Sequence, residues 1–186
     1  RLIDVEHEHV IHAQPTERYA ALSYVWGGFD QPTLKKDEIS FFQTRGSLSA
    51  LHLRLPKTIR DAMRICASLG IRHLWVDSLC IVQDALDEIE NQTAHMDWIY
   101  KAAYLTIVVA SGRDCDSGIP SIQPRERFQH SIIVEGVKLA TAPTIELIEK
   151  RVQNSVWNTR AWTLQEYSLS RRCLVFTTQD YYLQCG

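Results

Sequence analysis

The chain alternates between short apolar runs and longer segments in which apolar residues recur every three or four positions. Residues 19–26, 73–76 and 103–110 are dense in aliphatic and aromatic side chains, and each run stops at Gly, Asp or Ser. Runs of four to eight such residues are typical of buried strands. Two further strands are predicted at residues 172–178 and 181–184.

The segments between these strands have the spacing of amphipathic helices. The predicted helices span residues 56–69, 84–100 and 158–169. Pro56 suits the first turn of a helix, and Gly70 is suited to end one. We expect Asp84 to cap the second helix and Asn158 or Thr159 to cap the third, because short polar side chains accept hydrogen bonds from the first helical N–H groups.

Strands that alternate with helices predict an α/β fold, in which helices flank a mostly parallel central sheet. Residues 113–157 break this pattern, and residues 131–140 around Glu135 and Gly136 predict a β-hairpin inside an insertion. We expect one domain over residues 1–186, with a core at about 19–178.

Composition restricts the classes of protein that fit. The 186 residues are 45% hydrophobic and 23% charged, which is ordinary for one globular domain, and the formal charge of −2 gives no basic excess for binding nucleic acid. No apolar run reaches the roughly 18 residues that span a bilayer. The chain starts without Met and stops at Gly186, so we expect a piece of a longer protein.

The five cysteines are scattered and have no C-x-x-C spacing, which encodes neither a disulfide framework nor a zinc site. A reducing, cytoplasmic compartment is expected. His7, His9 and His12 have loose metal-like spacing without companion cysteines, so a solvated terminal segment is favoured over a metal site.

Asp77 interrupts the most apolar run of the chain, where a buried strand should end. Burying an unpaired charge is costly, so a carboxylate at this position indicates a partner or a functional role. In open α/β sheets, ligands bind outside the carboxyl ends of the strands. Asp77 is therefore a candidate ligand-binding residue.

Trp162 and Glu166 are four residues apart, which places both on one face of a helix. An indole beside a carboxylate raises the pKa of the acid by desolvation and offers a flat surface for a ligand ring. The alternative is an indole in the core with Glu166 at its rim. Arg160, near the start of this helix, is a candidate contact for a phosphate group.

Tyr24, Trp26, Gly27 and Gly28 follow the first strand and combine aromatic surfaces with a loop whose backbone can approach a ligand closely. They form neither a GxGxxG fingerprint nor a P-loop, and a Gly-Gly pair after a strand is also common as a simple turn. Ser78 and Cys80 lack any hydrolase signature, and Cys80 is favoured as a small core residue.

Four blocks of this sequence occur in a recognisable order: residues 19–27 (YAALSYVWG), 55–62 (LPKTIRDA), 74–84 (LWVDSLCIVQD) and 160–166 (RAWTLQE). Together these blocks resemble the heterokaryon incompatibility (HET) domain of filamentous fungi. The resemblance implies the death effector of a non-self recognition protein, which triggers programmed cell death when genetically different cells fuse. It also implies sensor or oligomerisation modules elsewhere in the parent protein.

A fainter likeness concerns Leu22, Ser23 and Tyr24 with Trp162 and Glu166, which are similar to segments of Toll/interleukin-1 receptor (TIR) domains. In some TIR domains the Glu of a W-x-x-x-E pattern is the catalytic residue of enzymes that release nicotinamide from NAD. This likeness implies a three-layer, TIR-like or flavodoxin-like sheet.

For the function, the TIR likeness implies an NAD(P) glycohydrolase with Glu166 as the catalytic residue. NAD or NADP would be the substrate rather than a cofactor, and no metal would be needed. Tyr24, Trp26, Gly27, Gly28, Asp77, Arg160 and Trp162 would bind the substrate, and self-association would activate the enzyme. The alternative is a non-catalytic adaptor that triggers death through protein–protein contacts.

Overall fold

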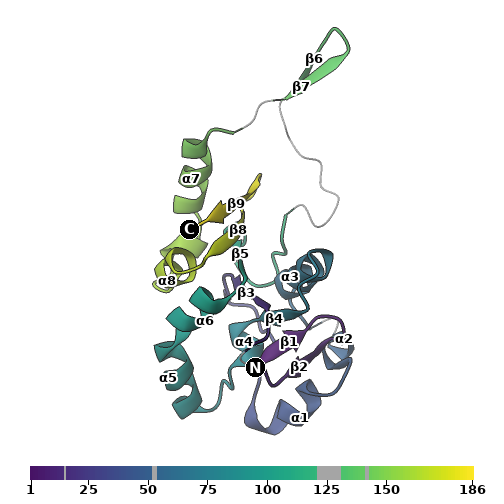
Figure 1. Ribbon diagram of the computed structural model, residues 1–186, viewed down its shortest axis with the longest axis vertical. Coiled ribbons are helices and arrows are strands. Elements are labelled where there is room, and N and C mark those ends of the chain that lie inside the picture. Colours follow the sequence, from purple (N-terminus) through teal and green to yellow (C-terminus); the bar gives the residue numbers. More distant parts are fainter. Residues whose placement is uncertain (15, 52–53, 121–130, 141–142) are drawn as a thin grey trace.

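A seven-stranded sheet organises the computed structural model, which describes residues 1–14, 16–51, 54–120, 131–140 and 143–186 (Figure 1). The strands are β1 (Leu2–Asp4), β2 (His9–Ile11), β3 (Tyr19–Ser23), β4 (His73–Trp75), β5 (Leu105–Val109), β6 (Ser131–Val134), β7 (Val137–Ala140), β8 (Arg172–Phe176) and β9 (Tyr181–Cys185). The helices are η1 (Lys36–Glu38), α1 (Ile39–Phe42), α2 (Ser47–Ala50), α3 (Lys57–Ser68), α4 (Asp77–Cys80), α5 (Leu86–Ala94), α6 (Met96–Ala102), α7 (Ile145–Gln153), η2 (Trp157–Thr159) and α8 (Thr163–Ser168).

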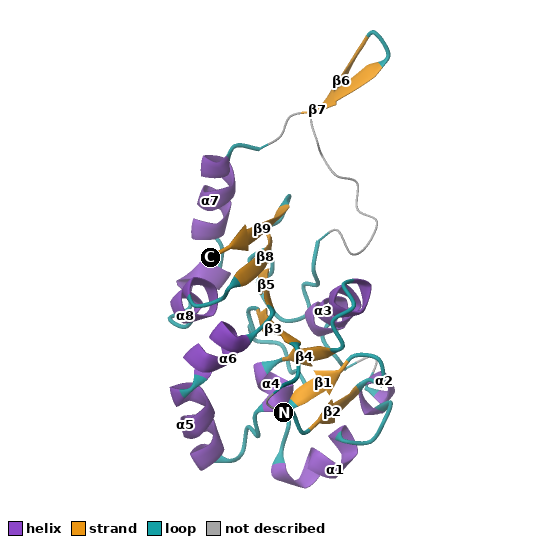
Figure 2. Ribbon diagram, in the orientation of Figure 1, coloured by secondary structure: helices purple, strands orange, loops and turns teal. Residues whose placement is uncertain are grey.

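The strand order of the sheet is β2-β1-β4-β3-β5-β8-β9. The four middle strands, β4, β3, β5 and β8, are parallel to one another. In chain order these strands are β3, β4, β5 and β8. The sheet places β4 on one side of β3, and β5 and then β8 on its other side, which is the order of a flavodoxin-like sheet. Helix α3 lies on one side of the sheet and α5, α6 and α8 lie on the other (Figure 2). The prediction of an α/β fold is therefore confirmed.

The prediction of a mostly parallel sheet holds only for these four middle strands. Both outer edges are antiparallel, because β1 pairs with β2 and β4, and β9 pairs with β8. The amino-terminal residues, which were expected to be a solvated segment, form the β1–β2 hairpin along the edge of β4. Strands of three residues are too short for an alternating pattern to reveal them.

The β1–β2 hairpin is anchored by Asp4, whose side chain is buried. Its carboxylate accepts a hydrogen bond from the Arg72 guanidinium at 2.8 Å and lies 3.0 Å from His7 Nδ1. Burial by itself would raise the pKa of Asp4, but hydrogen bonds from Arg72 and His7 hold it well below its usual range. An amino-terminal acid thus ties the edge hairpin to the residue just before β4.

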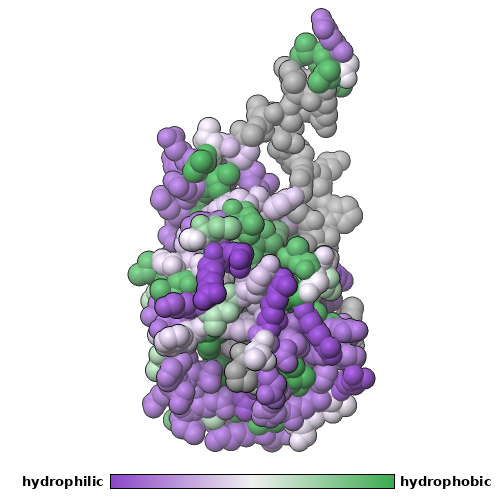
Figure 3. All heavy atoms as spheres, in the orientation of Figure 1, coloured by the Kyte–Doolittle hydropathy of each residue, from purple (hydrophilic) through white to green (hydrophobic). Residues whose placement is uncertain are grey.

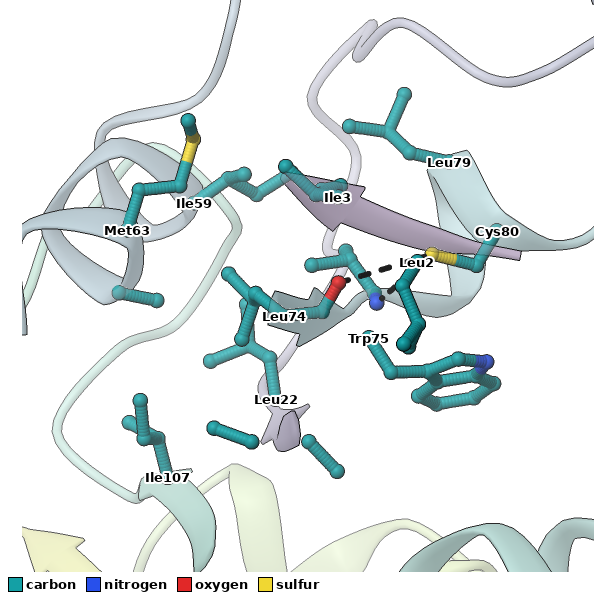
Figure 4. Packing of buried hydrophobic residues seen from close by; sticks show 14 of the residues in the cluster. Leu2, Ile3, Leu22, Ile59, Met63, Leu74, Trp75, Leu79, Cys80 and Ile107 are labelled. Atoms are coloured by element: carbon teal, nitrogen blue, oxygen red, sulfur yellow. Dashed lines mark hydrogen bonds between the residues drawn. The ribbon is translucent and has the colours of Figure 1, made fainter. Parts of the chain in front are cut away.

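Helix α3 follows the predicted pattern closely. Pro56 precedes its first residue, and Ile59, Ala62 and Met63 are buried at the spacing of one helical face. Gly70 ends the helix region with a φ of +66°, which glycine adopts without strain. Figure 4 shows Ile59 and Met63 of α3 beside Ile3 and Leu74 in the main core.

The two other helix predictions are partly wrong at their boundaries. The segment 84–100 is two helices that meet at His95, and Asp84 accepts a hydrogen bond from the Lys36 N–H instead of capping a helix. The last helix begins at Thr163 after a short 3-10 turn, so Trp162 occupies its N-cap position. Apolar spacing alone reports neither the break at His95 nor the 3-10 turn before Thr163.

The expected insertion at 113–157 contains the predicted hairpin, β6–β7, and helix α7. Its residues 121–130 and 141–142 lie outside the described residues. On the face shown in Figure 3, hydrophobic residues are exposed mainly in the upper half, whereas the lower half is mostly hydrophilic. Within the described part of the chain, none of the helices has the length and apolar character needed to cross a membrane.

Leu74 offers a test of the main core, because its side chain is fully buried on the strand that joins the edge hairpin to the parallel strands. We expect Leu74→Ala to lower the free energy of unfolding by about 3 kcal/mol through lost burial and a cavity. The control is Leu86→Ala, because Leu86 is 77% exposed and its truncation should cost less than about 0.5 kcal/mol. Urea denaturation measures both, and equal losses would contradict this account of the core.

Candidate active site

Glu166 lies on α8, and its side chain is buried against the carboxyl end of β3. Only 1% of the residue is exposed. Its Oε2 accepts a hydrogen bond from the hydroxyl of Ser23, the last residue of β3, and its Oε1 accepts one from the Arg160 guanidinium at 3.1 Å. Both carboxylate oxygens therefore have a donor, as a buried charge requires.

Trp157, in the turn before α8, completes this cluster. Its indole N–H donates to Ser23 Oγ at 2.7 Å, which leaves the Ser23 proton free to point at Glu166. Trp157 is itself 1% exposed, and Arg160 also donates to the Tyr24 carbonyl at 2.6 Å. We call Ser23, Trp157, Arg160 and Glu166 the Glu166 cluster.

Helix α8 is positioned by a second set of hydrogen bonds. The Ser170 hydroxyl donates to the Glu166 carbonyl at 2.6 Å and lies 2.6 Å from the Thr106 hydroxyl on β5. Ser170 and Thr106 are both buried, so α8 is pinned to the parallel strands beside the strand that carries Ser23. The Glu166 carboxylate is consequently held in one orientation.

Burial raises the pKa of Glu166 above its ordinary value, while the Arg160 charge and the Ser23 hydroxyl oppose that rise. The hydrogen bonds around the carboxylate suit its ionised form, since both oxygens act as acceptors. The arrangement is a buried ion pair with further donors, in which removing either partner leaves the other charge uncompensated.

Asp77 is a second carboxylate in the same region. It is the first residue of α4, just after β4, and its Oδ2 accepts a hydrogen bond from the Trp26 indole at 2.9 Å. Burial raises its pKa from 3.8 to about 6, and the Glu166 charge adds to the rise, whereas the Trp26 hydrogen bond and Arg160 lower it. Tyr24 links the two acids in space, because its carbonyl accepts from Arg160 and its hydroxyl bonds Ser78, the residue after Asp77.

Of the predicted aromatic residues, Tyr24 has no open face, because it is 1% exposed and its hydroxyl bonds Gln31 at 3.1 Å and Ser78 at 3.2 Å. Trp26 is half-buried, so part of its ring remains accessible beside Asp77. Trp162 is 42% exposed at the N-cap of α8. The buried indole joined to Glu166 is thus Trp157, through Ser23, rather than Trp162.

Gly27 and Gly28 play different parts. A Cβ on Gly27 would lie 2.5 Å from the Asp114 Cβ, and its φ is +65°, so glycine is needed where the loop after β3 meets the loop after β5. The Cys115 N–H donates to the Trp26 carbonyl across the same contact. An added Cβ on Gly28 would meet no atom within 4 Å, so this residue retains room for a ligand.

Sequence reasoning missed Ser23 and Trp157 as members of the cluster. Ser23 gave a signal, as the single polar residue within the apolar segment 19–26. Trp157 gave none, because it lies in a segment without helical or strand periodicity.

The other candidates are structural or already paired. Ser78 and Cys80 are buried, and burial raises the pKa of the Cys80 thiol to about 11, which disfavours a thiolate nucleophile. Possible ligand atoms of Asp4, Glu6 and His7 lie within 4.8 Å of one another. Arg72 already neutralises Asp4 there, so an acidic cluster of this kind gives no reason to assign a metal.

Comparison with known proteins agrees with the HET resemblance. The family described as "Heterokaryon incompatibility protein (HET)" matches residues 19–166. The chain belongs to this family. Heterokaryon incompatibility protein 6, OR allele, of Neurospora crassa is 32% identical over 101 residues, which cover 50% of this HET chain and 14% of that protein. No solved structure matches.

The matched region of the HET chain contains the whole Glu166 cluster and Asp77, with Glu166 as its last residue. The β1–β2 hairpin, β8 and β9 lie outside it. The family match thus extends from the first parallel strand to the helix that carries the buried acid.

Ser23 is the hydroxyl on which the Glu166 cluster depends. We expect Ser23→Ala to lower the free energy of unfolding by about 3 kcal/mol, because two buried groups, the Trp157 N–H and the Glu166 carboxylate, each lose a partner. Ser47→Ala is the control: Ser47 is also buried but bonds one backbone carbonyl, so about 1 kcal/mol is expected. Equal losses in chemical denaturation would show that the cluster adds nothing beyond one ordinary hydrogen bond.

The raised pKa of Asp77 predicts a pH-dependent stability. The folded HET chain binds this proton more tightly than the unfolded chain, so Asp77 contributes stability below about pH 4 that is lost as the pH rises through 6. Asn is neutral throughout. The free energy of unfolding of Asp77→Asn, relative to wild type, should therefore increase by about 2 kcal/mol from pH 4 to pH 7. A difference that stays flat in urea titrations across this range would contradict the raised pKa.

Proposed function

We propose that this HET chain is a death effector of heterokaryon incompatibility that acts as an NAD(P) glycohydrolase and releases nicotinamide. Membership of the HET family and the similarity to heterokaryon incompatibility protein 6 support a role in fungal incompatibility. The chain spans a small part of that relative, so its activity within a whole protein belongs to the proposal.

One observation carries the enzymatic part: Glu166 is a buried, pre-oriented carboxylate at the carboxyl end of a flavodoxin-like parallel sheet, with Asp77 nearby. Carboxylates placed in this way stabilise the positive charge that develops on a ribose when its glycosidic bond breaks. The bond between ribose C1′ and the nicotinamide nitrogen breaks, and its electron pair goes to that nitrogen. Water then adds to C1′ and its proton is lost to solvent.

The predicted substrate contacts take distinct parts in this proposal. Trp26 and Trp162 retain exposed ring surfaces on which the nicotinamide or adenine ring would stack, and Gly28 leaves room for the ribose or a phosphate. Asp77 would bind a ribose hydroxyl, and Arg160 would move from Glu166 toward a phosphate. Tyr24 and Gly27 would act through positioning, because burial or loop packing occupies them.

Substrate access requires a conformational change in this proposal. Glu166 is buried and paired with Arg160, so α8 or the Arg160 segment has to shift before C1′ can reach the carboxylate. Self-association, driven by sensor or oligomerisation modules of a parent protein, would favour the open form. A death effector that is closed as a single copy is also one that stays inactive until clustered.

The same closure favours a second candidate, a non-catalytic adaptor. Both oxygens of Glu166 already have donors, which is also what a purely structural ion pair requires. In that case death would follow from contacts with another protein, and cellular NAD would remain unchanged.

Nicotinamide release from NAD and NADP by concentrated protein distinguishes the glycohydrolase from the adaptor. We expect Glu166→Gln to lower the rate at least about 100-fold, because the amide carries no charge to stabilise the developing cation. Glu90→Gln is the matched control, since Glu90 is an exposed glutamate on α5 and its change should leave the rate within twofold.

The variant removes the negative charge that neutralises Arg160, which could destabilise the fold. Near-ultraviolet circular dichroism and a cooperative unfolding transition therefore check that Glu166→Gln is folded. Nicotinamide release at the wild-type rate from folded Glu166→Gln would overturn the catalytic assignment. Absence of release from wild-type protein, even when it is artificially dimerised, would favour the adaptor.

A further inference from the structure

A hollow lies at the carboxyl ends of β5 and β8, apart from the Glu166 cluster. It has a volume of about 390 Å³ and is bounded by residues 110–113, which follow β5, by Thr178, which follows β8, and by residues of α7 and the turn after it. The carboxyl ends of parallel strands are where α/β sheets bind ligands, and this volume lies at the low end of ordinary ligand sites.

The charged residues that line this cavity are all basic. They are Arg113 from the loop after β5, and Lys150 and Arg151 from α7. Arg151 is neutralised by an ion pair with Asp180. Among the described residues, Arg113 and Lys150 have no carboxylate partner, so two cations from separate elements border the hollow uncompensated.

Neutral hydrogen-bonding groups complete the lining. Ser111 Oγ is buried and has no hydrogen-bond partner among the described residues, although an unpaired buried hydroxyl is costly. Asn154 and Thr178 add an amide and a hydroxyl, whereas the Ser155 hydroxyl already donates to the Val152 carbonyl. A hydroxyl without a partner beside two free cations is the lining expected for an anionic oxygen ligand.

We propose that this cavity binds the diphosphate group of a nucleotide. Arg113, from the loop after β5, and Lys150, from α7, would each hold one phosphate, and a rotation of the Ser111 side chain would bring its unpaired hydroxyl to a phosphate oxygen. Two cations on separate elements suit two linked phosphates better than a single small anion.

The cavity is connected to the Glu166 cluster by a short segment of chain. Ser155 and Val156 line the cavity, and the next residue is Trp157, whose indole holds Ser23 against Glu166. A nucleotide that orders this segment would also set the position of Trp157. This second step rests on the proposed function, whereas the binding of a diphosphate does not.

ADP provides the test, because it carries a diphosphate and has no nicotinamide to lose. Isothermal titration calorimetry of the wild-type chain at low ionic strength should show ADP binding that weakens with added salt. The double variant Arg113→Gln/Lys150→Gln should bind ADP at least about tenfold more weakly, because two charge-assisted contacts are lost. Ser111→Ala should reduce the affinity by a smaller factor.

The matched control is Lys35→Gln/Arg54→Gln, which removes two exposed cations that do not line the cavity and should leave the ADP affinity within twofold. Inorganic pyrophosphate should compete with ADP, and adenosine should not. Absence of ADP and pyrophosphate binding to wild-type protein, or equal binding to the Arg113→Gln/Lys150→Gln variant, would overturn the proposal.

The diphosphate in the cavity could belong to the substrate NAD or to a separate nucleotide, and the kinetics of NAD turnover distinguish these two sources. If the cavity holds the diphosphate of the substrate, Arg113→Gln/Lys150→Gln raises KM for NAD and leaves kcat nearly unchanged. If it holds a separate nucleotide, ADP binding is lost while KM for NAD stays the same. Loss of ADP binding in a protein that never releases nicotinamide would support the diphosphate site and refute the glycohydrolase.

Discussion

The buried carboxylate of Glu166 is the constraint on which the rest of the site depends. A charge that is 1% exposed has to be matched, and the match comes from three separate places: Ser23 at the end of β3, Trp157 in the turn before α8, and Arg160 just after that turn. Because an unpaired buried charge is costly, the loss of any one of these segments would destabilise the packing of the other two around Glu166. The position of α8 on the sheet follows from that requirement.

The parallel middle of the sheet gives this cluster its setting. The chain runs from β3 to β4 on one side and returns to β5 on the other, so the loops after β3 and β5 meet above the sheet. Gly27 packs against Asp114 at that junction, and Asp77 extends from the end of β4 to the Trp26 indole. Asp77, Glu166 and Trp26 therefore lie at the carboxyl end of the parallel strands.

Closure and catalysis make opposite demands on Glu166. The same contacts that orient the acid also cover it, so a glycohydrolase built on this chain works only after a shift of α8 or Arg160. In the proposed function, the Arg160–Glu166 ion pair would keep the carboxylate covered until such a shift occurs. The cavity beside α7 is joined to this closure by the segment that ends in Trp157.

The sequence by itself determined the α/β class, the middle strands and helix α3, because apolar periodicity is a local signal. Asp77 stood out as an interruption of an apolar run, and Glu166 was singled out by its spacing from Trp162 and by the TIR likeness. Tertiary structure alone decided that Trp157 rather than Trp162 is the indole joined to Glu166, that Arg160 neutralises this acid, and that the first residues form the edge of the sheet. Ser23 and Trp157 lie far apart in the chain, the Arg160–Glu166 pair crosses the start of α8, and the edge strands have only three residues, so none of these contacts leaves a periodic pattern in the sequence.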